Sequence, residues 1–373
     1  MKTLGLYIHV PFCVKKCNYC DFYSIQGNDE IHRKYVADVI KSFEFWRYKL
    51  DTDTQVDTIY LGGGTPSVLG TDNLSKLLST AASDFNISPD AEITMEVNPN
   101  SVTEIDLQSL TKLGLNRISM GLQTANDDEL RTLGRSHTSA DATKAIEHIK
   151  KSGIDNFSLD VMTGIPLQTE ESLDKTLDFC IDAKATHIST YMLKIEKNTP
   201  FYKNAENYKF ADDDTHADLY EFTCNKLREN GFRHYEISNF CKDDKISRHN
   251  MKYWLLQDYL GIGPSAHSMI DRKRFFYPRN ISEFQNEKVI FESEGNTPQE
   301  YLMLSLRTDT GFSFKTFEEI YGITANTKLK AEVEKFSKYG LVSSKDNSFR
   351  LTEKGFLLSN TIISQLLDAA FRF

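Results

Sequence analysis

The sequence predicts an α/β fold, in which an open, partial barrel of six strand–helix units precedes a winged-helix-like C-terminal domain. Residues 4–193 alternate short apolar strands with amphipathic helical segments, and from about residue 297 helices are followed by two short strands. Successive strand–helix units imply a parallel sheet, because each crossover helix returns the chain to the same end. Right-handed crossovers curl such a sheet, and six units are fewer than the eight of a closed α/β barrel.

The first strand shows the pattern most clearly. Leu4, Leu6, Ile8 and Val10 alternate with other residues, as in a strand with two different faces. An amphipathic helix follows at about 30–46, with apolar residues at helical spacing. The further strands are predicted at 56–61, 91–97, 116–122, 157–162 and 187–193. The further helices are predicted at 72–85, 103–113 with Thr103 as the cap, 127–133, 139–152 and 170–183.

Three cysteines follow the first strand with the spacing C-x-x-x-C-x-x-C: Cys13, Cys17 and Cys20. Thiols so close in sequence converge on one point only if the backbone curls around it, which is typical of a metal site. Structural zinc normally takes four protein ligands. No fourth Cys or His follows closely here, since the position two after Cys20 is Phe22. Three thiolates on a cluster of four irons leave one iron open for another ligand. We read the remaining cysteines, Cys180, Cys224 and Cys241, as ordinary buried thiols.

Polar or flexible residues stand where the predicted strands end. The run Gly62–Ser67 (Gly-Gly-Gly-Thr-Pro-Ser) follows the second strand, and glycines there let backbone approach a ligand closely. The later strands deliver Glu96, Gln123, Asp160 and Tyr191. Taken singly, each is more often an edge or hydrogen-bonding residue. Because functional residues of α/β barrels cluster at the C-terminal strand ends, the set as a whole predicts a binding site.

The cysteine spacing, with Tyr7-Ile-His-Val-Pro-Phe before it and Asp21-Phe22-Tyr23 after it, resembles the radical S-adenosylmethionine (SAM) superfamily. It is most similar to the branch that contains oxygen-independent coproporphyrinogen III oxidase and a haem chaperone. The resemblance implies a [4Fe-4S] cluster on Cys13, Cys17 and Cys20, whose open iron binds SAM and which cleaves it to a 5′-deoxyadenosyl radical. It further implies SAM contacts from Tyr7, Tyr19, Gly63, Gly64, Thr65, Glu96, Gln123, Arg135 and Asp160.

A second candidate site lies beyond the sixth strand. After a helix from about 212 to 231 and a short strand at 235–240, the segment 247–254 is expected to be a loop carrying Arg248, His249, Tyr253 and Trp254. Haem iron takes an axial imidazole, and its propionates favour cations. A histidine among aromatics is more often an ordinary core residue, but His-Asn-x-x-Tyr-Trp resembles the haem-binding motif of the chaperone branch. His267, after a glycine-rich turn at 259–267, is an alternative liner of the SAM cavity.

The chain divides into three predicted domains: 1–200, the radical SAM partial barrel; 201–290, a barrel-closing extension with the His249 motif; and 291–373, the C-terminal domain. This last domain has expected helices at 297–306, 313–321, 327–339 and 352–370, and a wing formed by 341–342 and 349–351. A winged helix suggests DNA binding, but fold does not dictate function. We expect a cap or interaction module.

Composition limits the partners. A net charge of −9 in 373 residues argues against general nucleic-acid binding. No apolar run approaches the ~20 residues that span a bilayer, and the N-terminus enters a strand without a signal peptide. We therefore expect a cytoplasmic protein. The resemblance implies haem and haem-acceptor proteins as partners, membrane-associated acceptors included, and leaves a homodimer open.

Three functions remain in competition. The first is a haem chaperone that keeps the cluster and SAM, the second is oxidative decarboxylation of coproporphyrinogen III, and the third is a radical SAM enzyme with another substrate. The oxidase carries a fourth cysteine where this chain has Phe22, and an N-terminal extension where this chain reaches Cys13 almost at once. Together with the motif at His249, these departures favour the chaperone.

Overall fold

The computed structural model, which describes residues 2–284 and 288–371, contains the predicted open barrel. Its six parallel strands neighbour one another in chain order within a twelve-stranded sheet, and β1 and β6 do not pair. The fold class predicted from the sequence is therefore confirmed. The six strands are β1 (Thr3–Val10), β2 (Gln55–Gly63), β3 (Ile87–Val97), β4 (Arg117–Gln123), β5 (Phe157–Thr163) and β6 (His187–Met192).

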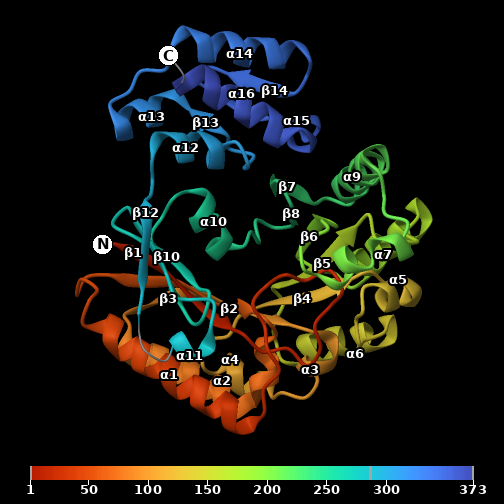
Figure 1. Ribbon diagram of the computed structural model, residues 1–373, viewed down its shortest axis with the longest axis vertical. Helices are drawn as coiled ribbons and strands as arrows, with labels where there is room; N and C mark the ends of the chain where they lie inside the picture. The colour runs from red at the N-terminus through yellow and green to blue at the C-terminus, as the bar shows by residue number, and fades with distance from the viewer. Residues whose placement is uncertain (1, 285–287, 372–373) are drawn as a thin grey trace.

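Crossover helices cover the outer face of this curved sheet (Figure 1). The aliphatic residues of β1, such as Leu4 and Ile8, are fully buried, as are Tyr35, Val39 and Phe43 of α1. Burying these two apolar faces against each other gives the barrel its main core. The helices are α1 (Asp29–Arg47), η1 (Pro66–Leu69), α2 (Gly70–Asp84), α3 (Pro99–Val102), α4 (Leu107–Thr111), α5 (Asp127–Thr132), α6 (Ser139–Lys151) and α7 (Glu170–Asp182).

One predicted helix is shorter than expected and has a second helix before it. The segment expected as a single helix from Thr103 to residue 113 contains only α4 (Leu107–Thr111), and α3 (Pro99–Val102) ends one residue before Thr103. Pro99 starts α3 earlier, since proline suits the first turn of a helix, and Thr103 follows α3 as its C-cap. The side chain of Asp106 then caps α4 by accepting from the backbone of Ser109 at 3.1 Å.

Additional strands extend the sheet beyond both barrel edges, and the sequence analysis missed most of them. The expected strand at 235–240 is a pair of antiparallel strands, and the expected glycine-rich turn at 259–267 contains a strand parallel to β1. The expected loop at 247–254 is mostly a helix. These elements are α8 (Pro200–Lys203), η2 (Ala205–Asn207), α9 (Asp213–Glu229), β7 (Arg233–Glu236), β8 (Asn239–Cys241), α10 (Arg248–Trp254), β9 (Tyr259–Ile262), β10 (His267–Ile270), β11 (Lys273–Phe276), α11 (Ile281–Phe284) and β12 (Ile290–Glu294).

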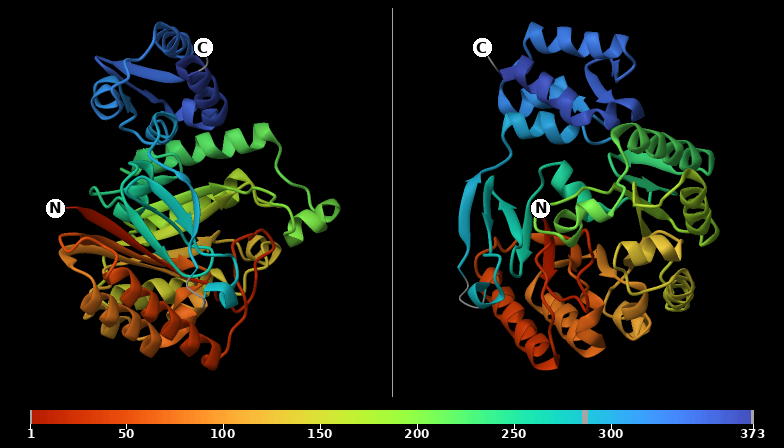
Figure 2. Two further views of the ribbon diagram at one scale, coloured as in Figure 1. Left: turned by 60° about the vertical axis from the view of Figure 1, so that its left-hand side comes forward. Right: turned by 45° about the vertical axis from the view of Figure 1, so that its right-hand side comes forward.

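The C-terminal domain sits at one end of the barrel (Figure 2). Its helices and wing lie close to the predicted positions, but the wing gains a third strand and the last helix is split. The predicted boundary at 290/291 falls at the start of β12, which pairs with β11, and residues 372–373 of the predicted domain lie outside the described residues. The elements are α12 (Pro298–Ser305), β13 (Phe312–Ser313), α13 (Phe314–Tyr321), α14 (Thr327–Lys338), β14 (Val342–Lys345), β15 (Ser348–Leu351), α15 (Glu353–Leu357) and α16 (Ser359–Phe371).

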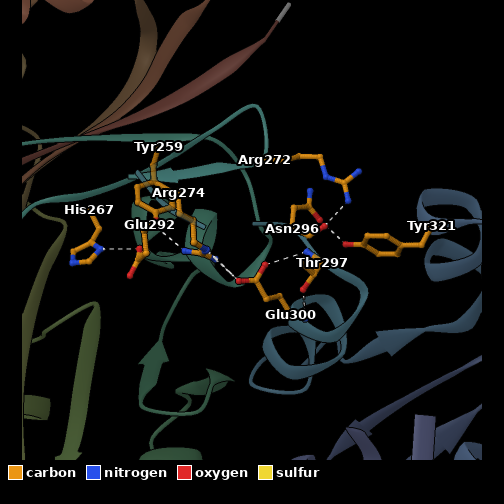
Figure 3. Close-up of polar contacts among 9 residues, drawn as sticks. All are labelled: Tyr259, His267, Arg272, Arg274, Glu292, Asn296, Thr297, Glu300 and Tyr321. Atoms are coloured by element: carbon orange, nitrogen blue, oxygen red, sulfur yellow. Dashed lines mark hydrogen bonds and ion pairs between the residues drawn. The ribbon is translucent and has the colours of Figure 1, made fainter. Parts of the chain in front are cut away.

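A polar joint connects this domain to the extended sheet (Figure 3). Arg274 of β11 forms an ion pair with Glu300 of α12 at 3.0 Å, and Arg272 donates to the backbone oxygen of Asn296 at 2.8 Å. Tyr321 of α13 donates to the side chain of the same Asn296. The joint thus fixes the first two helices of the domain against the β10–β11 hairpin. Among the described residues, none of the helices has the length and apolarity to cross a membrane.

Candidate functional site

A cavity of about 410 Å³ opens at the C-terminal ends of the parallel strands. Because parallel strands present their C-terminal ends at one edge, residues far apart in sequence meet there. Tyr191 of β6 and Phe22 also line the cavity. The structure brings most of the predicted site residues into its wall: Cys13, Cys17, Tyr19, Cys20, Gly63, Gly64, Thr65, Glu96, Gln123, Arg135 and Asp160.

The cysteine loop forms one side of this cavity. Its two ends are closed by backbone hydrogen bonds, from Cys13 to the oxygen of Ile25 at 3.0 Å and from Ile25 to that of Pro11 at 2.7 Å. All three of its thiols are free and half-buried. The described residues contain no group of three His, Cys, Asp or Glu side chains arranged for a single metal ion. A four-iron cluster differs from such an ion, since each thiolate binds a different iron.

Asn18 anchors the loop between the cysteines. Its backbone nitrogen donates to the oxygen of Leu133, and its side-chain amide donates to that of Thr132, both at 2.9 Å. Its own backbone oxygen accepts from Phe201 at 2.9 Å. The turn after α5 therefore holds the middle of the loop, and Gly134 fits there because an added Cβ would lie 3.0 Å from the Asn18 side chain.

The glycine run allows the loop and β3 to approach β2 closely. A Cβ on Gly64 would lie only 2.6 Å from the backbone oxygen of Phe12, and Gly63 has a φ of +102°. The nitrogen of Gly63 donates to Oε2 of Glu96 at 2.9 Å, while the hydroxyl of Tyr60 donates to Oε1 at 2.9 Å. The run thus places both a bare backbone and a half-buried carboxylate at the cavity.

Burial raises the pKa of Glu96 to about 7, and the hydrogen bond from Tyr60 only partly offsets that effect. Asp160, on the neighbouring face of the cavity, also has a raised pKa because it is buried. The hydroxyl of Ser119 donates to Asp160 at 3.1 Å. Two half-buried carboxyl groups with raised pKa values favour a cationic ligand, which would stabilise their ionised forms.

Arg135 links the cysteine loop to the strand ends. Its guanidinium lies 3.5 Å from Sγ of Cys17 and donates to Oδ1 of Asn98 at 2.5 Å and to the oxygen of Gly121 at 2.6 Å. Asn98 in turn donates to Oγ1 of Thr65 at 2.9 Å, which lies 3.7 Å from Sγ of Cys13. One polar network therefore joins two of the thiols.

The sequence analysis missed Asn98 and Ser119. Asn98 stands two positions after Glu96 and Ser119 four positions before Gln123, so strand alternation places each on the same face as a predicted site residue. This alternation of side chains along a strand was the pattern from which both residues could have been predicted to lie at the site. Gln123 itself is buried with a φ of +69°, an uncommon backbone conformation for a non-glycine residue at a strand end.

Two predicted site residues lie outside this cavity. Tyr7 lines a second cavity of about 420 Å³ on β1, and its hydroxyl lies 2.9 Å from Nδ1 of His9. His249 is the second residue of α10 and is fully buried. Its Nδ1 lies 2.8 Å from Oγ1 of Thr58 and its Nε2 lies 2.8 Å from the hydroxyl of Tyr253. Burial lowers the pKa of His249 to about 3, so the ring is neutral.

His249 was expected on a loop, and that expectation of the local structure is wrong, because the segment is the helix α10. The carboxylate of Glu92 accepts from the backbone nitrogens of Arg248 at 3.1 Å and of His249 at 3.0 Å. Together with the N-cap Ser247, whose side chain accepts from the nitrogen of Asn250, this remote contact stabilises the start of α10, and His249 is buried on that helix. His267, the expected alternative liner of the first cavity, lines the second cavity instead.

The first cavity suits the groups that the sequence predicts. Three free thiols on one wall are soft ligands for iron, and the bare backbone at Gly63 and Gly64 leaves room beside them. Glu96 supplies a carboxylate for an ammonium group, Gln123 an amide for hydroxyls, and Arg135 a cation for a carboxylate. The residues present therefore fit an iron–sulfur cluster with a zwitterionic ligand.

Comparison with known proteins gives an independent view. Residues 7–180 match the family model of the Radical SAM superfamily, and residues 296–358 match that of the HemN C-terminal domain. The chain is 35% identical to the heme chaperone HemW of Buchnera aphidicola subsp. Schizaphis graminum, covering 99% of both chains. It is 31% identical to the heme chaperone HemW of Bacillus subtilis, covering 97% of this chain and 98% of the relative.

A solved structure shows the same fold. The coproporphyrinogen III oxidase HemN of Escherichia coli superposes with a TM-score of 0.82 over 98% of this chain and 90% of its own, at 22% identity. At that identity the likeness concerns the fold alone.

Proposed function

This chain belongs to the family of HemW heme chaperones within the radical SAM superfamily, and from that premise we propose that it binds haem and delivers it to acceptor proteins. The observation that carries the proposal is full-length similarity to proteins named as chaperones, joined to a site that keeps three cluster thiols. Membrane-associated acceptors and a homodimer belong to the proposal as further expectations.

We propose that Cys13, Cys17 and Cys20 hold a [4Fe-4S] cluster, with SAM beside it in the first cavity. A reduced cluster of this kind supplies an electron to the SAM sulfonium. Within the protein, Glu96 receives the ammonium group, and the network of Arg135 and Asn98 keeps the loop in position. Thr65, Gln123 and Asp160 line the same cavity and complete the polar wall. Tyr19 and the backbone of Gly63 and Gly64 are assigned to SAM as well.

Tyr7 and His249 hold a different place in the proposal. Tyr7 borders the second cavity, so we assign it to SAM only on the resemblance of its motif. The resemblance of its motif predicts ligation of haem iron by His249, and His267, at the second cavity, is the competing candidate. Both ring nitrogens of His249 have partners in this structure, so ligation requires α10 to release it from Thr58 and Tyr253.

The oxidase remains the alternative function, because its fold is the same. Phe22, which stands at the position of the oxidase's fourth cysteine, is 65% exposed and lies on the walls of both cavities. An exposed phenyl ring there supports an apolar ligand surface next to the cysteine loop. This observation supports the chaperone over the oxidase.

Anaerobic reconstitution of the cluster followed by titration with haem tests the proposal. We expect stoichiometric haem binding, transfer of haem to an apoprotein acceptor, and no turnover of coproporphyrinogen III in a parallel assay with SAM. Turnover without specific haem binding would establish the oxidase instead. The variant with alanine at Cys13, Cys17 and Cys20 is expected to fold, as judged by circular dichroism, and to lose iron and its brown colour.

A further inference from the structure

The second cavity adjoins the first at the end of the cysteine loop. It has a volume of about 420 Å³ and shares Asp21 and Phe22 with the first cavity. Its size falls in the range of small-molecule sites. Aromatic side chains from β1, the cysteine loop, α10 and β9 line it: Tyr7, Phe22, Tyr23, Tyr253 and Tyr259. Such a wall suits a flat, largely apolar ligand.

Three histidines lie in or behind this wall, and two of them are fully engaged. His9 contacts the Tyr7 hydroxyl through Nδ1 at 2.9 Å and the backbone oxygen of Tyr23 through Nε2 at 3.2 Å. His249 is bound through both nitrogens behind Tyr253. The motif around His249 therefore contributes the ring of Tyr253 to the wall, whereas His249 itself positions that ring.

His267 differs from both. Its side chain is 52% exposed, and its Nδ1 lies 3.4 Å from Oε2 of Glu292 on β12 (Figure 3). Among the residues that the structure describes, none is bonded to its Nε2. The ring stacks on Phe276 with centroids 5.1 Å apart, which limits its orientations. An imidazole held by a carboxylate at one nitrogen and free at the other is the usual arrangement of a metal-ligating histidine.

Arg279 supplies a cation at the same cavity. It donates to the backbone oxygen of Asp21 and, within the described part of the chain, has no ion pair with a carboxylate. Its remaining guanidinium donors suit an anionic substituent of a ligand, and arginine binds carboxylates in a fixed geometry.

We propose that this second cavity is the haem site, with Nε2 of His267 as the axial ligand of the iron and Arg279 paired with a propionate. The assignment rests on the proposed chaperone function. The bond to the iron forms from the lone pair of a neutral imidazole. No electron is transferred, and no proton is released. The macrocycle lies along the tyrosine wall, adjacent to the cysteine loop at Phe22.

Haem titration of the full-length, cluster-reconstituted protein tests this site. We compare the parent with His267→Ala, Arg279→Gln, His249→Ala and, as a matched control, His148→Ala, which removes an imidazole from α6. The readouts are the dissociation constant, the Soret band and the electron paramagnetic resonance spectrum of ferric haem. His267→Ala is expected to weaken binding at least tenfold and to lose the histidine-ligated spectrum, and added imidazole is expected to restore that spectrum.

The other variants separate the roles. Arg279→Gln is expected to weaken binding severalfold with an unchanged spectrum, and His148→Ala to match the parent. His249→Ala is expected to keep the ligand spectrum with weaker binding, as suits a positioning residue. Unchanged affinity and spectrum in His267→Ala, or loss of the ligand spectrum in a folded His249→Ala, would overturn the assignment while leaving the chaperone function intact. Absence of stoichiometric haem binding in the parent would instead refute the proposed function.

Discussion

The backbone nitrogen of Gly63 donates to Oε2 of Glu96 at 2.9 Å, so a glycine at the end of β2 binds a half-buried carboxylate at the end of β3. A second hydrogen bond, from Tyr60, reaches the other oxygen of this carboxylate. These two bonds hold Glu96 at the cavity wall, yet burial still raises its pKa to about 7. The site is therefore built around an acid that is only partly ionised at neutral pH without a cationic ligand.

Replacing Glu96 by glutamine is expected to remove a pH dependence of stability. The pKa of Glu96 rises from 4.5 to about 7 on folding, so the folded state binds this proton more tightly than the unfolded state. The resulting stabilisation of the folded state is complete at low pH and is lost as pH rises from 4.5 to about 7. The shift corresponds to ~3 kcal/mol. Urea unfolding of the cluster-free parent and of Glu96→Gln should diverge from pH 5 to pH 8, with the parent losing more stability. Parallel curves would contradict the raised pKa of Glu96.

The affinity for SAM is expected to rise with pH in the same window, because only the ionised Glu96 attracts the ammonium group. Below pH 7 each unit should change the dissociation constant by up to tenfold, with a plateau above it. Isothermal titration of the reconstituted protein with SAM measures this slope. In Glu96→Gln the slope should be flatter and the binding weaker throughout. An unchanged slope in the variant would place the titrating group elsewhere.

Gly64→Ala is expected to destabilise the protein by ~2 kcal/mol or more, since its Cβ would meet backbone atoms at 2.6 Å and 2.8 Å that cannot move independently. Gly153→Ala is the control, because its φ is +87° but its added Cβ meets nothing within 4 Å. The control should lose about 1 kcal/mol, from backbone strain alone. Denaturant unfolding compares the two. An equal loss in both variants would show that the approach of Phe12 to Gly64 is not tight.

The barrel strands were predictable because their apolar residues follow a local periodicity, whereas the position of His249 was not. The helix that carries it has Ser247 as its local N-cap, but its first backbone nitrogens also donate to Glu92, a residue of β3 that no local pattern relates to it. Strands β9 to β11 have four residues each, and their pairing with β1 or with one another decides their conformation. The clustering of the strand-end residues around one cavity was therefore predictable, and the placement of residues held by long-range contacts was not.

Asn18→Ala is expected to lower cluster retention without unfolding the barrel. The substitution removes the side-chain bond to Thr132, which fixes the loop between Cys17 and Cys20. A looser loop exposes the thiols, so iron bound after reconstitution and desalting should fall severalfold while circular dichroism stays unchanged. Asn73→Ala, which removes a comparable local bond on α2, serves as the control and should retain iron. Equal retention in Asn18→Ala would mean that the backbone bonds of this residue suffice.

Arg274→Ala is expected to loosen the joint between the extended sheet and the C-terminal domain. Arg274 pairs with Glu300 and also donates to the Tyr259 hydroxyl at 3.2 Å, so the substitution removes the cation from a partly buried contact. Glu300 keeps its capping bond from the Thr297 nitrogen at 3.0 Å, so α12 itself should persist. The expected cost is ~1 kcal/mol in stability of the joint, measured as faster amide hydrogen exchange in α12. Lys273→Ala, one residue earlier on β11, is the control and should leave this exchange unchanged. Protection of α12 equal to the parent would show that apolar packing alone holds the domain.

The same variant affects the second cavity. Because Tyr259 lines that cavity, Arg274→Ala should also weaken haem binding modestly.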